Sequence, residues 1–269
     1  MRKIITTLTN FGSGTKSHIL LSLLAAAQKK GTVFAKYDFD PDHATLSSAY
    51  SERDEDGDAL AEQDPITGCP KVDIDKDPEM ILKIAKTEAP YILADLPARA
   101  LHEIFTALGQ RKGVEDLYNS YFDKDIMATH IIPLIDGDKS LKTLEAIYSA
   151  ISTADIDEDA QIELIVVKNI GYMDSFGVNF TNNALIEYQR SNIVAAIKNN
   201  PRFIFKEVEF ATQLNTNAKE AITPTDSNSD HKVNQLLDIL ARPDLDYDVE
   251  RLISNMVRDG AKLLKAIQS

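Results

Sequence analysis

The chain contains very little cysteine and has no tryptophan. Its single cysteine, Cys69, cannot form a disulfide within one chain, as is usual for proteins that stay in a reducing compartment. No apolar run approaches the roughly 18 residues that a membrane-spanning helix needs. The first residues also lack the charged, apolar and small-residue regions of an export signal. We therefore expect a cytoplasmic protein.

Positive charge is also in short supply. There are 29 Lys and Arg residues against 42 Asp and Glu residues, which gives a formal net charge of -13. Sequence-independent DNA binding depends on Lys and Arg side chains that neutralise phosphates, so this composition argues against it. The sequence contains no dense basic segment that would reverse this expectation, and the simplest role of the acidity is solubility.

Short apolar segments alternate with helical patterns through most of the chain, which predicts a mostly parallel sheet sandwiched by helices. Strands are predicted over residues 4–8, 32–37, 91–95, 126–134, 162–167 and 203–209, with a further short candidate at 72–74. Helices are predicted over residues 17–30, 42–50, 77–86, 99–110, 139–151, 184–198, 231–240 and 248–267. Residues 113–125 are interpreted as a variable connection and 225–229 as a polar linker. We expect a single domain over 1–269, with an α/β core over 3–225 and a helical C-terminal cover over 226–269.

A glycine-bearing turn follows the first predicted strand. It reads Asn10-Phe11-Gly12-Ser13-Gly14-Thr15-Lys16-Ser17. In a phosphate-binding loop of the form G-x-x-x-x-G-K-[S/T], backbone N–H groups surround the phosphates, the Lys reaches the terminal phosphates and the hydroxyl binds Mg²⁺. Lys16 and Ser17 occupy the positions of that pair, whereas Asn10 and Thr15 replace the two glycines. The alternative is an ordinary helix start.

Acidic side chains end two of the predicted strands. Asp38 and Asp40 follow the second strand and, by strand alternation, point to the same side; Asp95 ends the third. The carboxyl edge of a parallel sheet is where such folds bind ligands. The alternatives are an Asp-Pro turn, in which Asp40 caps the next helix, and an Asp95 that caps the helix over 99–110.

Taken in order, these landmarks resemble the ParA/MinD group of deviant P-loop ATPases. The matching segments are Asn10 to Ser17, Asp38 to Pro41, Ala94 to Ala98 and Val167 to Asn169. The resemblance covers roughly residues 3–225. Within the group, the segment from Asp40 to Leu46 is most similar to the TraL-like and StbB-like proteins of plasmid conjugation and stability. The resemblance thus implies a nucleotide-dependent switch in plasmid partition, stability or conjugative transfer.

The resemblance also implies a role for each matching position. ATP and Mg²⁺ would be the cofactors, with Gly12, Ser13, Gly14, Thr15, Lys16, Ser17 and Asn169 contacting the nucleotide. Lys16, Asp38 and Asp40 would be catalytic, and Ser17 and Asp95 would serve the Mg²⁺ ion. Members of the group close into an ATP-bound homodimer, and the ATP state controls binding to a protein adaptor or cargo, to DNA or to membrane.

Three positions depart from the family pattern: Phe11 replaces its signature Lys, Ser13 its second loop glycine and Thr15 the glycine before the catalytic Lys. Losing a cation at the transferred phosphate costs on the order of 10³ or more in rate in other phosphoryl-transfer sites. We therefore expect either a weak Mg²⁺-dependent ATPase or a non-hydrolysing interaction scaffold. A third hypothesis is a small ATP-dependent ligase of the dethiobiotin synthetase kind.

The last predicted helix carries an apolar face interleaved with Arg and Lys. Terminal helices of MinD-like proteins lie on membranes in this way, which makes a membrane contact one interpretation. Packing against the core is the other, and the acidic residues Asp248, Glu250 and Asp259 favour it.

Overall fold

The structure, a computed structural model, describes residues 1–9, 15–40, 43–97, 111–134, 137–169, 180–212, 221–222 and 235–269. The predicted helix over 99–110, the linker over 225–229 and the start of the helix over 231–240 lie outside these residues.

The described residues form a six-stranded sheet in the order β2-β3-β1-β4-β5-β6. The strands are β1 (Arg2–Thr7), β2 (Phe34–Asp38), β3 (Tyr91–Asp95), β4 (Ile126–Leu134), β5 (Ile162–Asn169) and β6 (Phe203–Phe210). Every neighbouring pair is parallel. The predicted α/β class is therefore confirmed, and all the carboxyl ends of the strands lie at one edge of the sheet.

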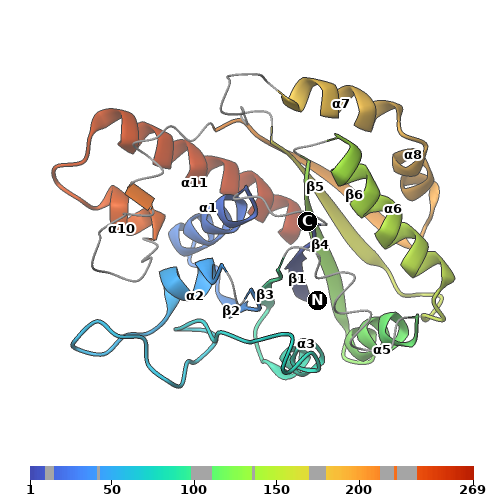
Figure 1. Cartoon of the computed structure of the whole chain (residues 1–269), viewed down its shortest axis with the longest axis horizontal. Coiled ribbons are helices and arrows are strands. Elements are labelled where there is room, and N and C mark those ends of the chain that lie inside the picture. The colour runs from blue at the N-terminus through green and yellow to red at the C-terminus, as the bar shows by residue number, and fades with distance from the viewer. Residues whose placement is uncertain are drawn as a thin grey trace.

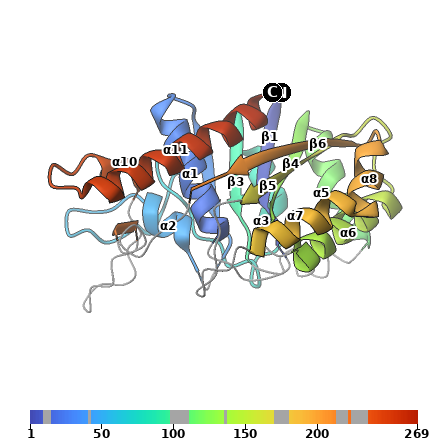
Figure 2. The same ribbon diagram turned by 90° about the horizontal axis from the view of Figure 1, so that it is seen from above.

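Helices cover both faces of the sheet (Figures 1 and 2). On one face lie α1 (Thr15–Lys29), α2 (Thr45–Tyr50), α10 (Leu236–Leu240) and α11 (Tyr247–Gln268). On the other lie α3 (Met80–Lys83), the 3₁₀ turn η1 (Ile84–Lys86), α5 (Arg111–Phe122), α6 (Gly137–Thr153), α7 (Phe180–Arg190) and α8 (Asn192–Asn199). Each face has its own buried apolar cluster, as a sheet buried on both sides requires.

Two predictions about helices were wrong. Residues 113–125, predicted as a variable connection, are mostly helical, because α5 runs from Arg111 to Phe122. Its buried residues, Val114, Leu117, Tyr118 and Tyr121, recur at helical spacing. The helix predicted over 184–198 is two helices, because the backbone at Ser191 is extended (φ -74°, ψ 129°) and separates α7 from α8.

The short strand predicted over 72–74 does not form. Instead, residues 65–72 run beside β2 at the edge of the sheet. The N–H groups of Lys36 and Asp38 donate to the carbonyls of Pro65 (2.7 Å) and Pro70 (3.0 Å), and Val72 N donates to Asp38 O at 2.7 Å. This segment covers an edge that would otherwise expose unpaired backbone groups beside Asp38.

The C-terminal helix α11 packs its apolar face against α1. Its residues Ile253, Met256, Leu263, Leu264 and Ile267 are fully buried, and the two helices lie side by side in both ribbon views (Figures 1 and 2). The apolar face is thus occupied inside the protein, which favours the packing interpretation. Among the described helices, none has the length and apolar character needed to cross a membrane.

Two lysines from the sheet hold the carboxyl end of α11. Lys3 Nζ donates to Ile267 O, and Lys206 Nζ donates to Ala266 O at 2.7 Å. Both ammonium groups also contact the buried carboxylate of Glu163, at 3.0 Å from Lys3 and 2.7 Å from Lys206. Cations at this end of a helix satisfy its last carbonyls and oppose its dipole, so these contacts fix α11 on the sheet.

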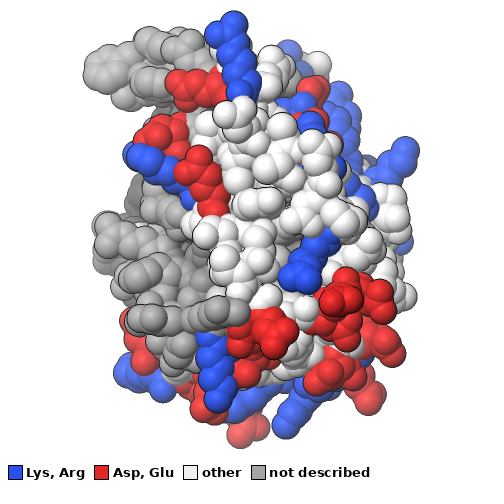
Figure 3. Space-filling model, turned by 90° about the vertical axis from the view of Figure 1, so that its right-hand side faces the viewer, with Lys and Arg blue, Asp and Glu red and all other residues white. Residues whose placement is uncertain are grey.

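One face of the molecule, at the right of Figure 1, has an uncharged centre. Figure 3 shows Lys and Arg side chains mixed with Asp and Glu side chains around the margin of this face. Among the described residues of this view, Lys and Arg form no continuous surface.

The backbones of α1 and α11 come close together at Gly260. A Cβ built on Gly260 would lie 1.9 Å from the carbonyl oxygen of Ser22, so the helices must move apart to accommodate it. We expect Gly260→Ala to lower the free energy of unfolding by about 1–3 kcal/mol, although Ala normally stabilises a helix relative to Gly. Urea unfolding measures this, with Ser254→Ala on the exposed side of α11 as the control. An unchanged or increased stability would show that the helices are not in contact there.

Candidate functional site

The structure brings Lys16 together with two of the predicted acids. Lys16 is the second residue of α1, and its Nζ lies 3.0 Å from Asp95 Oδ1 and 3.5 Å from Asp40 Oδ2. It also donates a hydrogen bond to the carbonyl of Leu96, just beyond β3. The side chain of Lys16 is buried. A lysine at the start of the first helix therefore reaches across to the carboxyl ends of β2 and β3, where a parallel sheet binds its ligands.

Asp38 completes the group of acids. It is fully buried, and the β2–β3 register places it directly beside Asp95. Its two carboxylate oxygens accept hydrogen bonds from the N–H groups of Asp40 (3.1 Å) and Ser47 (2.9 Å). Burial, together with the neighbouring Asp95 carboxylate, raises the pKa of Asp38 to about 7. The cause is the cost of removing a carboxylate from water beside a second negative charge.

Asp40 does not cap the helix that follows it. Its Oδ1 accepts a hydrogen bond from His43 N at 3.0 Å, while the N-cap of α2 is Ala44, whose side chain makes no capping bond. The backbone N–H of Ser47 in the first turn of α2 is satisfied by Asp38 instead. The capping alternative for Asp40 was therefore wrong, and its second oxygen faces Lys16.

The two carboxylate oxygens of Asp95 differ in their contacts. Its Oδ1 contacts Lys16 and accepts a hydrogen bond from Thr7 Oγ1 at 3.0 Å. Its Oδ2 is buried and has no hydrogen-bond partner among the residues that the structure describes. Burial raises the pKa of Asp95 above its usual range, and the Lys16 ammonium opposes that effect. A buried carboxylate oxygen without a partner is a position suited to a cation or to a water bound to one.

Ser17 follows Lys16 at the start of α1. Its half-buried hydroxyl is 3.1 Å from the hydroxyl of Thr45, the first residue of α2. Within the described residues, no cluster of three or more His, Cys, Asp or Glu side chains is suited to hold a metal by itself. Mg²⁺ is commonly held by one or two protein oxygens together with waters and substrate phosphates. The oxygen donors of Ser17 and Asp95 fit that arrangement.

Some predicted site residues cannot be placed. Asn10 to Gly14, which include Phe11, Gly12 and Ser13, lie outside the described residues. Thr15 opens α1 and Asn169 ends β5, but the structure describes only their backbones. The contacts proposed for Gly12, Ser13, Gly14, Thr15 and Asn169 therefore remain predictions.

Sequence reasoning missed three groups of the site. They are the hydroxyl of Thr7, which donates to Asp95, the carbonyl of Leu96, which accepts from Lys16, and the hydroxyl of Thr45 beside Ser17. Thr7 ends β1 in the row next to Asp95, so strand pairing would have suggested it once the sheet order was known. No local sequence pattern predicts that the Leu96 carbonyl accepts from Lys16, or that two hydroxyls from different helices form a hydrogen bond.

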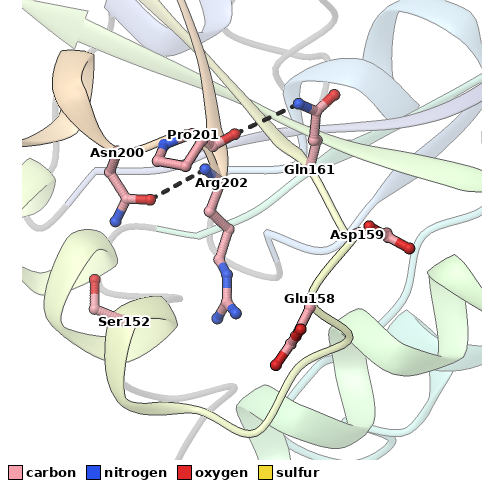
Figure 4. Close-up of a pocket in the computed structure, with 7 residues that line it drawn as sticks. All are labelled: Ser152, Glu158, Asp159, Gln161, Asn200, Pro201 and Arg202. Atoms are coloured by element: carbon pink, nitrogen blue, oxygen red, sulfur yellow. Dashed lines mark hydrogen bonds between the residues drawn. The ribbon is translucent and has the colours of Figure 1, made fainter.

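A surface hollow of about 470 Å³ lies at the opposite edge of the sheet, where β5 and β6 begin. The guanidinium of Arg202 points into it, opposite Glu158, while Arg202 N donates to Asn200 Oδ1 at 3.0 Å (Figure 4). Its other acidic lining residue is Asp159. Two carboxylates against one guanidinium do not favour a phosphate, and the hollow is remote from Lys16 because it lies at the other ends of the strands.

No protein-family model matches the chain, and no curated protein does. Solved structures do resemble it along most of its length. One is the MinC:MinD cell division protein complex of Aquifex aeolicus, with 13% identity, coverage of 99% of this chain and 96% of that chain, and a TM-score of 0.45. Another is a putative plasmid partition protein of Borrelia burgdorferi bound to AMPPNP, with 14% identity, 98% and 99% coverage and a TM-score of 0.41.

A third is a cobyrinic acid a,c-diamide synthase of Mycobacterium smegmatis with a bound ATP analog and magnesium. Its identity is 15%, the coverage is 100% of this chain and 95% of that chain, and the TM-score is 0.40.

The raised pKa of Asp38 predicts a pH effect on stability. Its carboxyl keeps a proton up to about pH 7 when folded, but ionises near its ordinary pKa of 3.8 when unfolded. Ionisation between these values favours the unfolded chain, so stability falls as pH rises from about 4 to about 7. We expect Asp38→Asn to reduce the loss of stability between pH 5 and pH 8 by at least about 1 kcal/mol.

Urea unfolding of the wild type and the variant at both pH values measures this difference. Asp244→Asn, at an exposed carboxylate, is the matched control. An Asp38→Asn variant whose pH dependence equals that of the wild type would contradict the burial of an ionisable Asp38.

Proposed function

We propose that the chain is a nucleotide-dependent switch of the ParA/MinD type that binds ATP with Mg²⁺. The observation that carries the proposal is the meeting of Lys16 with Asp40 and Asp95 at the carboxyl edge of the sheet. A lysine at the start of the helix after the first strand, with acids from the two adjacent strand ends, supports a triphosphate site at that helix start.

Each side chain has a distinct task in this proposal. Lys16 exchanges its contact with Asp95 for the terminal phosphates, so that its charge is balanced in both states. Ser17 and Asp95 hold the Mg²⁺ ion, whose positive charge offsets the phosphates when it is bound. Asp40 orients the attacking water, with Asp38 beside it. Asn169, at the end of β5, reads the adenine edge.

A non-hydrolysing scaffold is the second candidate, and one observation favours it. The Lys16 ammonium is already satisfied by two carboxylates and a carbonyl, so the site is stable with no phosphate to bind. Thr15 and Phe11 replace residues that the ATPases of this group use for catalysis, which points in the same direction. The scaffold keeps the fold and acts through its surfaces without turnover.

The expected partners are a second copy of the chain and a protein adaptor or cargo in plasmid partition, stability or transfer. The net charge of -13 argues against non-specific DNA binding, and the mixed charges of the face in Figure 3 agree with that expectation. The apolar side of α11 is buried, which leaves little of that helix to insert into a membrane.

Nucleotide binding through Lys16 is the first test. We expect the wild type to bind a slowly hydrolysed ATP analogue with Mg²⁺, and Lys16→Gln to bind it at least about 10-fold more weakly, because a charged contact to phosphate is lost. Isothermal titration measures both affinities, and circular dichroism confirms that the variant is folded. Lys142→Ala, on the exposed side of α6, should bind like the wild type. A folded wild type that gives no heat of binding at millimolar analogue would exclude the switch.

Turnover separates the two candidates. For the switch we expect slow steady-state phosphate release that Asp40→Asn reduces by about 10²-fold or more, because general-base assistance at the attacking water is removed. Asp244→Asn is the control. Nucleotide binding without phosphate release above background would instead support the scaffold.

A further inference from the structure

The hydroxyls of Ser17 and Thr45 form a hydrogen bond whose donor can be assigned from the other contacts of Thr45. Their oxygens are 3.1 Å apart, although the residues are 28 positions apart in the chain. Thr45 Oγ1 also lies 3.3 Å from the carbonyl of His43, to which it donates. A hydroxyl has one proton, so a Thr45 that donates to His43 must accept the proton of Ser17. The lone pairs of Ser17 Oγ are then turned away from Thr45.

His43 is also connected to Lys16, the residue before Ser17, through Asp40. His43 N donates to Asp40 Oδ1 at 3.0 Å, and Asp40 Oδ2 faces Lys16 Nζ at 3.5 Å. A closed circuit therefore runs from Lys16 through Asp40, His43 and Thr45 back to Ser17. Because Lys16 and Ser17 are consecutive, the contacts of Asp40, His43 and Thr45 connect these two side chains to each other.

We propose that Thr45 is a positioning residue that orients the Ser17 hydroxyl toward the divalent cation accompanying the nucleotide. The proposal rests on the proposed function. Its chemical basis is that a hydroxyl ligand gives a lone pair to the cation and must place its proton on another acceptor. Partners that orient metal ligands in this way typically change metal affinity by about 10–100-fold when they are removed.

Besides its bond to His43 O, the Thr45 hydroxyl makes one other hydrogen bond among the described residues, to Ser17. It does not cap α2, because Asp38 accepts the hydrogen bond from Ser47 N in the first turn. Thr45 is also only half-buried, so its hydroxyl is not needed to fill the core. The contact with Ser17 is the one that connects α2 to the start of α1 through side-chain hydroxyls, and the proposal assigns it to the cation site.

The test measures cation dependence directly. Binding of a fluorescent ATP analogue is followed at fixed nucleotide while Mg²⁺ is titrated, which gives the Mg²⁺ concentration at half-maximal binding. We expect Thr45→Val, which keeps the shape and removes the acceptor, to raise that concentration about 10-fold. Thr45→Ser, which keeps the hydroxyl, should behave like the wild type. Thermal unfolding should be the same for all three proteins.

A double-mutant cycle separates positioning from a structural role. In a Ser17→Ala background, Thr45→Val should leave the Mg²⁺ requirement unchanged, because there is no hydroxyl left to orient. Ser48→Ala, one turn further along α2, is the matched control and should match the wild type. A Thr45→Val effect that persists without the Ser17 hydroxyl would overturn the positioning role of Thr45. A wild-type Mg²⁺ requirement in Thr45→Val, or a raised Mg²⁺ requirement in Thr45→Ser, would overturn it as well.

The outcomes also distinguish the role of Thr45 from the proposed nucleotide-dependent switch. A wild type that shows no Mg²⁺-dependent nucleotide binding would overturn both. A wild type that shows it, with Thr45→Val unchanged, would overturn only the role of Thr45.

Discussion

The buried contact between the Lys16 ammonium and the Asp95 and Asp40 carboxylates is the interaction on which the site depends. Removing one partner of a buried ion pair typically costs about 3–5 kcal/mol, because the other charge is left uncompensated. Here two carboxylates contact one ammonium, and Asp38 lies buried beside Asp95. Burial is the main cause of the raised pKa values of Asp38 and Asp95; neighbouring carboxylates add to it, and the Lys16 ammonium opposes it at Asp95.

The position of Lys16 depends in turn on helix packing far from the site. Lys16 lies at the start of α1, and α1 is held against α11 where Gly260 meets the backbone of Ser22. The carboxyl end of α11 is fixed by Lys3 and Lys206 through its last carbonyls. Contacts between α1, α11 and the sheet therefore help to position a side chain that acts at the carboxyl ends of the strands.

Much of this arrangement follows from local sequence. Alternating apolar strands and helices predict the parallel sheet, and the acids after two strands predict that Asp38, Asp40 and Asp95 lie at its carboxyl edge. These predictions succeed because they need only local information. Side-chain periodicity is a property of one helix or strand, and parallel strands bring their carboxyl ends to the same side of the sheet.

The rest depends on contacts that no local pattern contains. Helix α5 was missed because its start is polar and because the burial of its four apolar side chains follows only from their packing against the sheet. Residues 65–72 cover β2 because an edge strand has backbone N–H and C=O groups that lack a partner strand. This segment forms those hydrogen bonds with an irregular backbone, which has no sequence periodicity to predict it. The pairing of Ser17 with Thr45 requires α1 and α2 to be placed first.

If Lys16 is the internal counter-ion of Asp95, the two side chains contribute jointly to the stability of the fold. A double-mutant cycle in urea unfolding measures this coupling, with Lys16→Met, Asp95→Asn and the two combined. We expect each single change to be strongly destabilising and the double variant to lose at least about 1 kcal/mol less than the sum of the two, because neither charge is left alone. Additive losses would mean that the two side chains do not interact and that Lys16 is not the counter-ion of Asp95.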